Sequence, residues 1–377
     1  MKNNLEKIDE NERRQIDEAQ DFAECHTAGI KARSKIPGEV KTDLDAENAS
    51  DTASIIIDIL GQNYGTHNIA SNILVLTEDI RSGRIKPFIK FNNDKSPVAC
   101  AALVQINENE VELGRAACIK DTNGGNGQLM IEAFNQWKNK KLFPESKILR
   151  AEVRTAKATK EVPGGQATQV ICLNKIGFVP TAMGPMFHHG IPDRQEVFLL
   201  ASIMRENNNH GFDSEKLIPT SIGEIDERKM FSIFWKKFFG KLPNFSETNT
   251  NGSNSINLEA RVSGPIIEIK TSENANDVDQ IIENFFEIDG RFALARIPID
   301  LPIEQMASVS SRLRKNSFRL AGFEPSIKGN NISIDILFGR LSEIGKRLMV
   351  LPSFAENIFD HREEEILIQN SILWRQI

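Results

Sequence analysis

The stretch VELGRAACIKDTNGGNGQLMIEAFNQW, residues 111–137, decides the fold. Its first part, 111–120, is an apolar run that predicts a strand, and 128–140 has the i, i+3/i+4 apolar spacing of an amphipathic helix. Glycine lets successive backbone N–H groups turn toward one point, and a helix N-terminus adds partial positive charge. The turn is therefore either an anion site suited to a pyrophosphate or a tight turn without a ligand. Its glycines are Gly124, Gly125 and Gly127.

The segments around this turn predict a mixed α/β order. Two helices come first, at 54–61 and 74–83, and the apolar runs 85–91, 97–106 and 111–120 then predict an antiparallel meander. After the glycine turn and its helix come a strand at 148–155, a short helix at 166–176 and a last strand at 196–204. We expect residues 51–204 to form one domain around a mixed sheet.

Two common nucleotide sites do not fit the glycine turn. A P-loop requires Gly-Lys-Ser/Thr at the helix start, whereas Gly127 is followed by Gln128 and Leu129. A dinucleotide fingerprint lies in a βαβ unit, with an acidic residue about 20 positions later. Here the turn follows a meander, so neither site is expected.

Two motifs of this region resemble the GCN5-related N-acetyltransferase (GNAT) superfamily. The family loop R/Q-x-x-G-x-G/A matches residues 122–127 at both glycines, and Thr122 replaces the usual Arg or Gln. The family helix N-x-x-A-x-x-L-Y-x-x-x-G-F aligns with 166–178, and Leu173 replaces the Tyr that often protonates the CoA thiolate. The resemblance covers about 55–204.

The resemblance implies an α/β GNAT-like acyl-CoA N-acyltransferase fold and a site for acetyl-CoA or another acyl-CoA. It implies transfer of the acyl group to an amine of a small molecule or protein, by direct attack in a ternary complex and without a metal. The pantetheine amides would lie along the splayed strand at Ala117, Cys118 and Ile119. The remaining cofactor contacts would be Thr122, Asn123, Gly124, Gly125, Asn126, Gly127, Gln128 and Gln166.

Two side chains are candidates for proton transfer. Glu112 belongs to the strand beside the thioester and is the candidate base for the attacking amine; the alternative is a strand carboxylate that faces solvent. His188 lies in a loop where the acceptor would enter, and the alternative is a solvated histidine. Cys118 and Cys172 fit small core residues better than a covalent acyl-cysteine mechanism.

Residues 258–377 are predicted to be a degenerate second GNAT-like half. The segment 119–122 is echoed at 269–272, an offset of 150, which places Ala275 and Asp277 opposite Gly125 and Gly127. A Cβ and a negative charge would then stand in the anion site, so we expect one acyl-CoA per chain. A second echo, at an offset of 140, relates Leu173, Lys175, Phe178 and Pro185 to Leu313, Lys315, Phe318 and Pro325.

The remaining parts are a charged N-terminal arm at 1–50 and a bridging segment at 205–257. In the latter, Ser221 and Glu224 form an S-x-x-E capping box for a helix. We expect its aromatic face to be buried between two domains; the alternative is a membrane-surface helix. The Ser/Asn-rich stretch 245–257 fits a flexible linker. The aromatic residues are Phe231, Phe234, Trp235, Phe238 and Phe239.

Composition narrows the function further. The 377 residues carry 46 basic and 52 acidic side chains, a net charge of -6, which disfavours nucleic acid as a partner. Four widely spaced cysteines indicate neither zinc nor disulfides. The absence of an apolar signal region or membrane-length apolar run favours a cytoplasmic protein. The alternatives to an enzyme are a non-catalytic acyl-CoA sensor or scaffold, and a structural tandem module.

Overall fold

The computed structural model describes most of the chain outside its N-terminal arm, several loops and parts of the C-terminal segment. The described ranges are 39–41, 48–64, 72–119, 125–155, 165–185, 196–205, 216–248, 258–263, 266–271, 292–328 and 331–343, with 345, 352, 354–355, 358–359, 364 and 367–368.

The first half of the chain follows the order that the sequence predicts. The expected helices and strands are present because apolar periodicity and polar turns mark them clearly. The sequence does not predict the strands at 39–41 and 179–185, and the first helix extends beyond its expected range at both ends. The elements are β1 (Glu39–Lys41), α2 (Ala49–Tyr64), α3 (Ile73–Arg81), β2 (Ile85–Phe91), β3 (Pro97–Asn107), β4 (Glu110–Cys118), α4 (Asn126–Lys138), β5 (Ile148–Arg154), α5 (Gln166–Gln169), the π-helix η3 (Val170–Ile176), β6 (Val179–Pro185) and β7 (Val197–Met204).

The second half contains a connecting helix and further strands. Its elements are β8 (Leu217–Pro219), the 3-10 helix η4 (Thr220–Ile222), α6 (Ile225–Phe239), β9 (Asn244–Ser246), β10 (Leu258–Ser263), β11 (Ile266–Thr271), β12 (Phe292–Pro298), α8 (Ile303–Lys315), β13 (Arg319–Lys328) and β14 (Asn331–Leu341).

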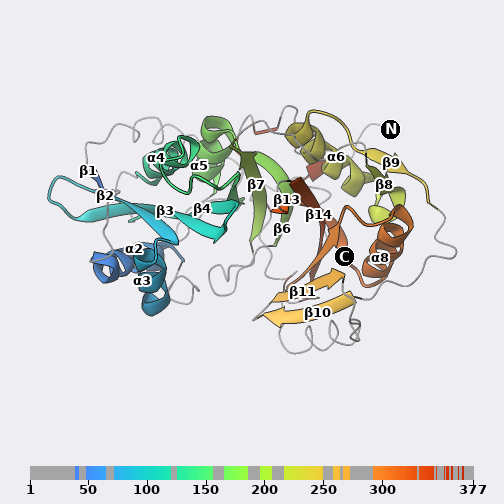
Figure 1. Cartoon of the computed structure of the whole chain (residues 1–377), viewed down its shortest axis with the longest axis horizontal. Coiled ribbons are helices and arrows are strands. Elements are labelled where there is room, and N and C mark those ends of the chain that lie inside the picture. Colours follow the sequence, from blue (N-terminus) through green and yellow to red (C-terminus); the bar gives the residue numbers. More distant parts are fainter. Residues whose placement is uncertain are drawn as a thin grey trace, which may run out of the picture.

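One sheet runs through both halves, in the order β1-β2-β3-β4-β5-β7-β6-β13-β14-β12-β11-β10. Two neighbouring pairs are parallel, β4–β5 and β11–β12, and the other described pairs are antiparallel. The predicted fold class, α/β with a mixed sheet, is confirmed. Figure 1 shows this sheet crossing the molecule from β1 to β10.

Helices cover both faces of the N-terminal part of the sheet. Figure 1 shows α4 and α5 on one side of β3 and β4, and α2 and α3 on the other. The α4 side holds a large core that includes Phe88, Leu129 and Trp137 and continues under α6 and α8. The α2 side holds a smaller core around Ile56 and Ile89. The sheet therefore separates two packed layers.

The helix α6 packs against β6 and β13, the strands at which the two halves meet. Phe323 of β13 lies with its ring 5.2 Å from that of Trp235 and 5.6 Å from that of Phe231, measured between centroids. Both α6 rings are fully buried, so they cannot enter a membrane surface. The helix starts later than expected, because Ser221 lies in the 3-10 helix η4 and Glu224 is the N-cap. The Glu224 N–H donates a hydrogen bond to the Glu227 carboxylate (2.8 Å).

An ion-pair cluster also joins the halves. Arg150 of β5 contacts Glu110 of β4 (2.9 Å) and Glu324 of β13 (2.5 Å), and Glu324 contacts Arg296 of β12 (3.1 Å). The Ile327 N–H donates a hydrogen bond to Glu110 (3.2 Å). Burial opposes ionisation of Glu324, but the two arginines outweigh it and leave the pKa of this carboxyl below its ordinary value. The cluster lies where β4 and β5 begin.

Candidate functional site

The parallel strands β4 and β5 separate soon after they begin. They pair at Glu110–Ile148, Val111–Leu149 and Glu112–Arg150, and their described residues form no pair beyond Glu112. The rest of β4 pairs only with β3, while β5 continues beside β7. An opening in the backbone pairing thus lies in the middle of the sheet, where unpaired strand edges can bind an extended ligand.

A β-bulge lies on β4 at the start of this opening. Opposite β3, Cys100 pairs with Ala117 and Ala102 with Gly114, so Arg115 and Ala116 face one residue of β3. Arg115 has φ +51°, a left-handed conformation that is uncommon outside glycine. The Cys100 thiol donates to its carbonyl oxygen (3.3 Å). The bulge changes which side chains share a face of the strand.

The end of β4, where pantetheine contacts were predicted, is held by neighbouring elements. The Ile119 N–H donates to the Val98 carbonyl (2.9 Å), and the Asn63 side-chain amide donates to the Cys118 carbonyl (2.8 Å). These two backbone groups are thus already engaged in the protein. Ala117 is buried and Cys118 is half-buried.

The glycine turn is described only from Gly125 onward; Thr122, Asn123 and Gly124 lie outside the described residues. Gly125 is the N-cap of α4, has φ +134°, and makes no side-chain cap. The N-terminal N–H groups of α4 therefore point toward the turn, as an anion site requires. Asn126 bonds within the turn: its side chain accepts from the Gly127 N–H (2.9 Å).

Gly127 has a packing role that the sequence does not reveal. A β-carbon at this position would overlap with the Cδ1 atom of Ile171 in η3. The absence of a side chain therefore lets α4 approach η3 closely. A glycine in the motif is thus explained by helix packing as well as by phosphate approach, and the two reasons need separate tests.

Lys90 is a component of this region that the sequence analysis missed. It lies on β2, is 2% exposed, and its Nζ donates to the Gln128 side chain of α4 (3.2 Å). A β-carbon on Gly125 would lie 2.7 Å from the Lys90 Cδ. The buried ammonium group thus lies beside the start of α4. Within the strand IKPFIKF, only the alternation that places Lys90 on the same face as Phe88 points to its burial.

The helix motif places Gln166 at the first, half-buried position of α5, near the end of β5. The neighbouring Gln169 is fully buried: its amide donates to the Arg154 carbonyl (3.0 Å) and accepts from the Ala355 N–H (2.8 Å). Arg154 forms a buried two-point ion pair with Glu196, at 2.6 and 2.8 Å. These contacts fix the end of β5 at the wide end of the opening.

Of the two proton-transfer candidates, only Glu112 is described, and it is half-buried. It faces away from Val111 and Leu113, which belong to the core on the α4 side. His188 lies outside the described residues. Burial raises the pKa of the Cys100 and Cys172 thiols to about 12, so both are core residues that stay protonated near neutral pH.

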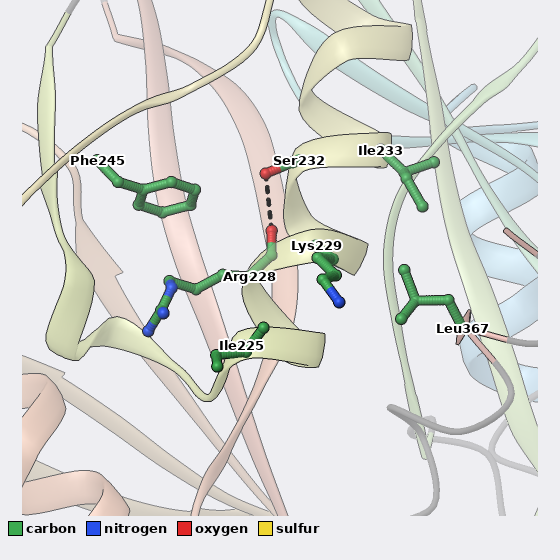
Figure 2. Close-up of a pocket in the computed structure, with 7 residues that line it drawn as sticks. All are labelled: Ile225, Arg228, Lys229, Ser232, Ile233, Phe245 and Leu367. Carbon is green, nitrogen blue, oxygen red and sulfur yellow. Dashed lines mark hydrogen bonds between the residues drawn. The ribbon is translucent and has the colours of Figure 1, made fainter.

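A separate hollow of about 430 Å³ lies between α6, Phe245 and Leu367, and no residue of β4 or β5 lines it (Figure 2). Its polar side chains are engaged with the protein: Arg228 donates to the Thr220 and Gly223 carbonyls, and Lys229 contacts Asp226 (3.3 Å). It therefore offers mainly apolar contacts. Among the described residues, no acidic, His or Cys cluster fits a metal, and no helix is long and apolar enough to span a membrane.

No protein-family model and no curated protein matches the sequence. Solved N-acetyltransferases are structurally similar over 45% of the chain. An N-acetyltransferase from Staphylococcus aureus Mu50 (12% identity, 98% of that chain, TM-score 0.34) is one. Another is spermidine N-acetyltransferase from Vibrio cholerae in complex with CoA and spermine (13% identity, 95% of that chain, TM-score 0.31). A third is aminoglycoside 6'-acetyltransferase type Ii (11% identity, 97% of that chain, TM-score 0.32).

Proposed function

We propose that the chain is an acyl-CoA-dependent N-acyltransferase whose site is the opening between β4 and β5. The observation that carries the proposal is the loss of β4–β5 pairing after Glu112, on the strand that precedes the helix start at Gly125 and Asn126. An extended pantetheine arm fits an unpaired strand edge, and its pyrophosphate fits a helix N-terminus. Acetyl-CoA is the donor we test first, and the cytoplasm is the proposed location.

The proposed chemistry needs few protein groups. The amine nitrogen attacks the thioester carbonyl, a C–N bond forms, the C–S bond breaks, and CoA leaves as a thiolate. A thiol with a pKa near that of free cysteine, about 8.5, leaves without a dedicated acid, which suits Leu173 at the usual Tyr position. Glu112 takes the proton lost by the amine, and positioning supplies the rest.

Two measurements test this proposal. Calorimetric titration with CoA should give one site per chain, and thiol release from acetyl-CoA should depend on an amine. Glu112→Gln keeps shape but removes the base, so kcat should fall by about 10²-fold while the KM for acetyl-CoA changes little. CoA binding without thiol release would favour a sensor or scaffold. An unchanged kcat in Glu112→Gln would remove that residue from the mechanism.

We also propose that the two halves are copies of one unit. The order β3-β4-β5-β7-β6 of the first half corresponds to β10-β11-β12-β14-β13 of the second, with the same parallel and antiparallel pairs. Both copies carry the same bulge, at 180/182 opposite β7 and at 320/322 opposite β14. Both also turn with positive φ before a buried phenylalanine, at Gly177 and Ser317. The turns and the bulges of the two copies are thus both related by the offset of 140 residues that the second sequence echo shows.

The two equivalent bulges meet at the junction. Ala182 of β6 pairs with Gly322 of β13, which supports an approximate two-fold axis between the copies. Strand pairing relates Glu112 to Glu268, an offset of 156 and not the 150 suggested by the sequence echo. The positions that correspond to Gly125 and Gly127 then fall in 272–291, outside the described residues.

The second copy differs at the position of the opening. There β11 and β12 still pair at Ile269–Ala295, one residue beyond the equivalent of the last β4–β5 pair. This supports a non-catalytic role for the second half and one donor site per chain. Calorimetry that gave two CoA sites per chain would contradict this proposal.

A further inference from the structure

We propose that Arg115 binds a carboxylate of the acceptor, so that the acceptor is a dipolar amine of the amino-acid class. The inference rests on the proposed N-acyltransferase function and concerns the same opening. It starts from the bulge of β4, which brings the Glu112 carboxylate and the Arg115 guanidinium to the same side of the sheet.

The backbone at Arg115 is specialised. Glu112 and Arg115 are three residues apart, a spacing that puts side chains on opposite faces of a regular strand. The extra residue of the bulge and the left-handed φ of Arg115 change this alternation. A non-glycine residue in this conformation is a reason to suspect function.

Glu112 is directed along the strand toward Arg115. A β-carbon on Gly114 would overlap with the Glu112 Oε1 atom, so the carboxylate lies over Gly114. Electrostatic coupling of Arg115 is strongest with Glu112 and then with Asp79 of α3, which places the guanidinium on the α3 side of the sheet. The acid and the guanidinium thus face the same layer.

The Arg115 side chain makes no hydrogen bond or ion pair within the described part of the chain, and its Nε is buried without an acceptor. Burial lowers the pKa of this guanidinium. Asp79, the other nearby acid, is engaged by Arg84 (3.4 Å), whose Nε donates to the Gln105 carbonyl (3.3 Å).

A buried Nε with its neighbouring Nη forms the side-on fork that binds a carboxylate through two parallel hydrogen bonds. The local charges are balanced, with Glu112 and Asp79 against Arg84 and Arg115. A balanced set suits a ligand with one positive and one negative group better than it suits a polyamine. An α-amino acid would present its amine to Glu112 and its carboxylate to Arg115.

The experiment compares amino acids with their carboxamides, which keep the amine and side chain but lack the anion. Thiol release from acetyl-CoA is measured for both series with wild type, Arg115→Asn and Arg115→Lys. Asparagine tolerates the left-handed backbone, and lysine keeps the charge without the fork. Arg81→Asn, which removes an exposed arginine that pairs with Glu78 on the surface of α3, is the matched control. Circular dichroism and thermal melting establish that each variant is folded.

We expect wild type to prefer amino acids over carboxamides by at least tenfold in kcat/KM. In Arg115→Asn this preference should disappear through a higher KM for amino acids, with kcat and the carboxamide reaction nearly unchanged. Arg115→Lys should restore part of it, and Arg81→Asn should keep it. If Arg115→Asn fails to fold, Arg115→Lys alone must show a preference for amino acids that is smaller than that of wild type.

Several results would overturn the inference. One is that wild type uses amino acids and carboxamides equally well or prefers polyamines. Another is that Arg115→Asn lowers kcat/KM equally for all acceptors. A third is that the preference follows a carboxylate on the acyl group, so that succinyl-CoA is used better than acetyl-CoA with a neutral amine. A separate calorimetric titration with CoA distinguishes the two levels. If CoA binds and no amino acid is a preferred acceptor, only the inference fails; if CoA does not bind, the proposed function fails with it.

Discussion

Replacing Gly127 by alanine, alone and together with Ile171→Val, separates the two reasons for a glycine at the start of α4. The structure directs a β-carbon at 127 into the Cδ1 atom of Ile171. Forcing a methyl group into such a contact costs about 1–3 kcal/mol of the free energy of unfolding. Ile171→Val removes Cδ1 and costs about 0.5–1.5 kcal/mol by itself.

The double variant should therefore be more stable than the sum of its parts. We expect it to unfold within about 1 kcal/mol of wild type, which corresponds to a favourable coupling of at least about 0.5 kcal/mol between the sites. Because the β-carbon points toward η3, we also expect the Kd for CoA to change by no more than about threefold in the double variant. Urea unfolding and calorimetric CoA titration measure the two quantities.

A matched control is Gly61→Ala in α2, where a β-carbon meets nothing within 4 Å. Helix propensity alone should make this variant neutral or more stable by about 0.5–1 kcal/mol. The reasoning is refuted if the double variant is as stable as wild type and still binds CoA more than tenfold more weakly. In that case the ligand itself requires a glycine at 127.

Three other predictions concern the packing around the site. Phe323→Ala should lower the free energy of unfolding by about 4 kcal/mol, and Phe323→Leu by much less, in urea titrations, because four α6 rings pack on it. Glu324→Gln should lower the free energy of unfolding by roughly 3–5 kcal/mol at pH 7, because it leaves buried arginine charge without its partner. Since Arg150 and Arg296 lower the pKa of Glu324 in the folded protein, this difference should be lost in unfolding curves as pH falls through that lowered pKa. In folded protein at pH 8, iodoacetamide should leave Cys100 and Cys172 unmodified by mass spectrometry.

The sequence predicts the elements of the first half well because their apolar periodicity is strong and their turns are polar. It does not predict the bulge, since an arginine with φ +51° at position 115 has no local signal. Nor does it show that Lys90 is buried, because that depends on how α4 crosses β2. The sequence predicts the capping box at Ser221 because an S-x-x-E pattern is met there. In the structure the box forms one turn later, between Glu224 and Glu227, where the N-cap is not one of the usual Ser, Thr, Asp or Asn residues.

The position of the ion-pair cluster connects the second half of the chain to the proposed chemistry. Glu110 and Arg150 belong to the short paired stretch at the closed end of the β4–β5 opening, and Glu324 of β13 holds Arg150 there. An opening of fixed shape requires one end that stays closed while the other end stays separated. We infer that the second half fixes the closed end through this cluster and through Phe323 under α6, while Gln169 and the Arg154–Glu196 pair fix β5 at the wide end. A non-catalytic copy would in this way determine the geometry of the site without contacting the donor.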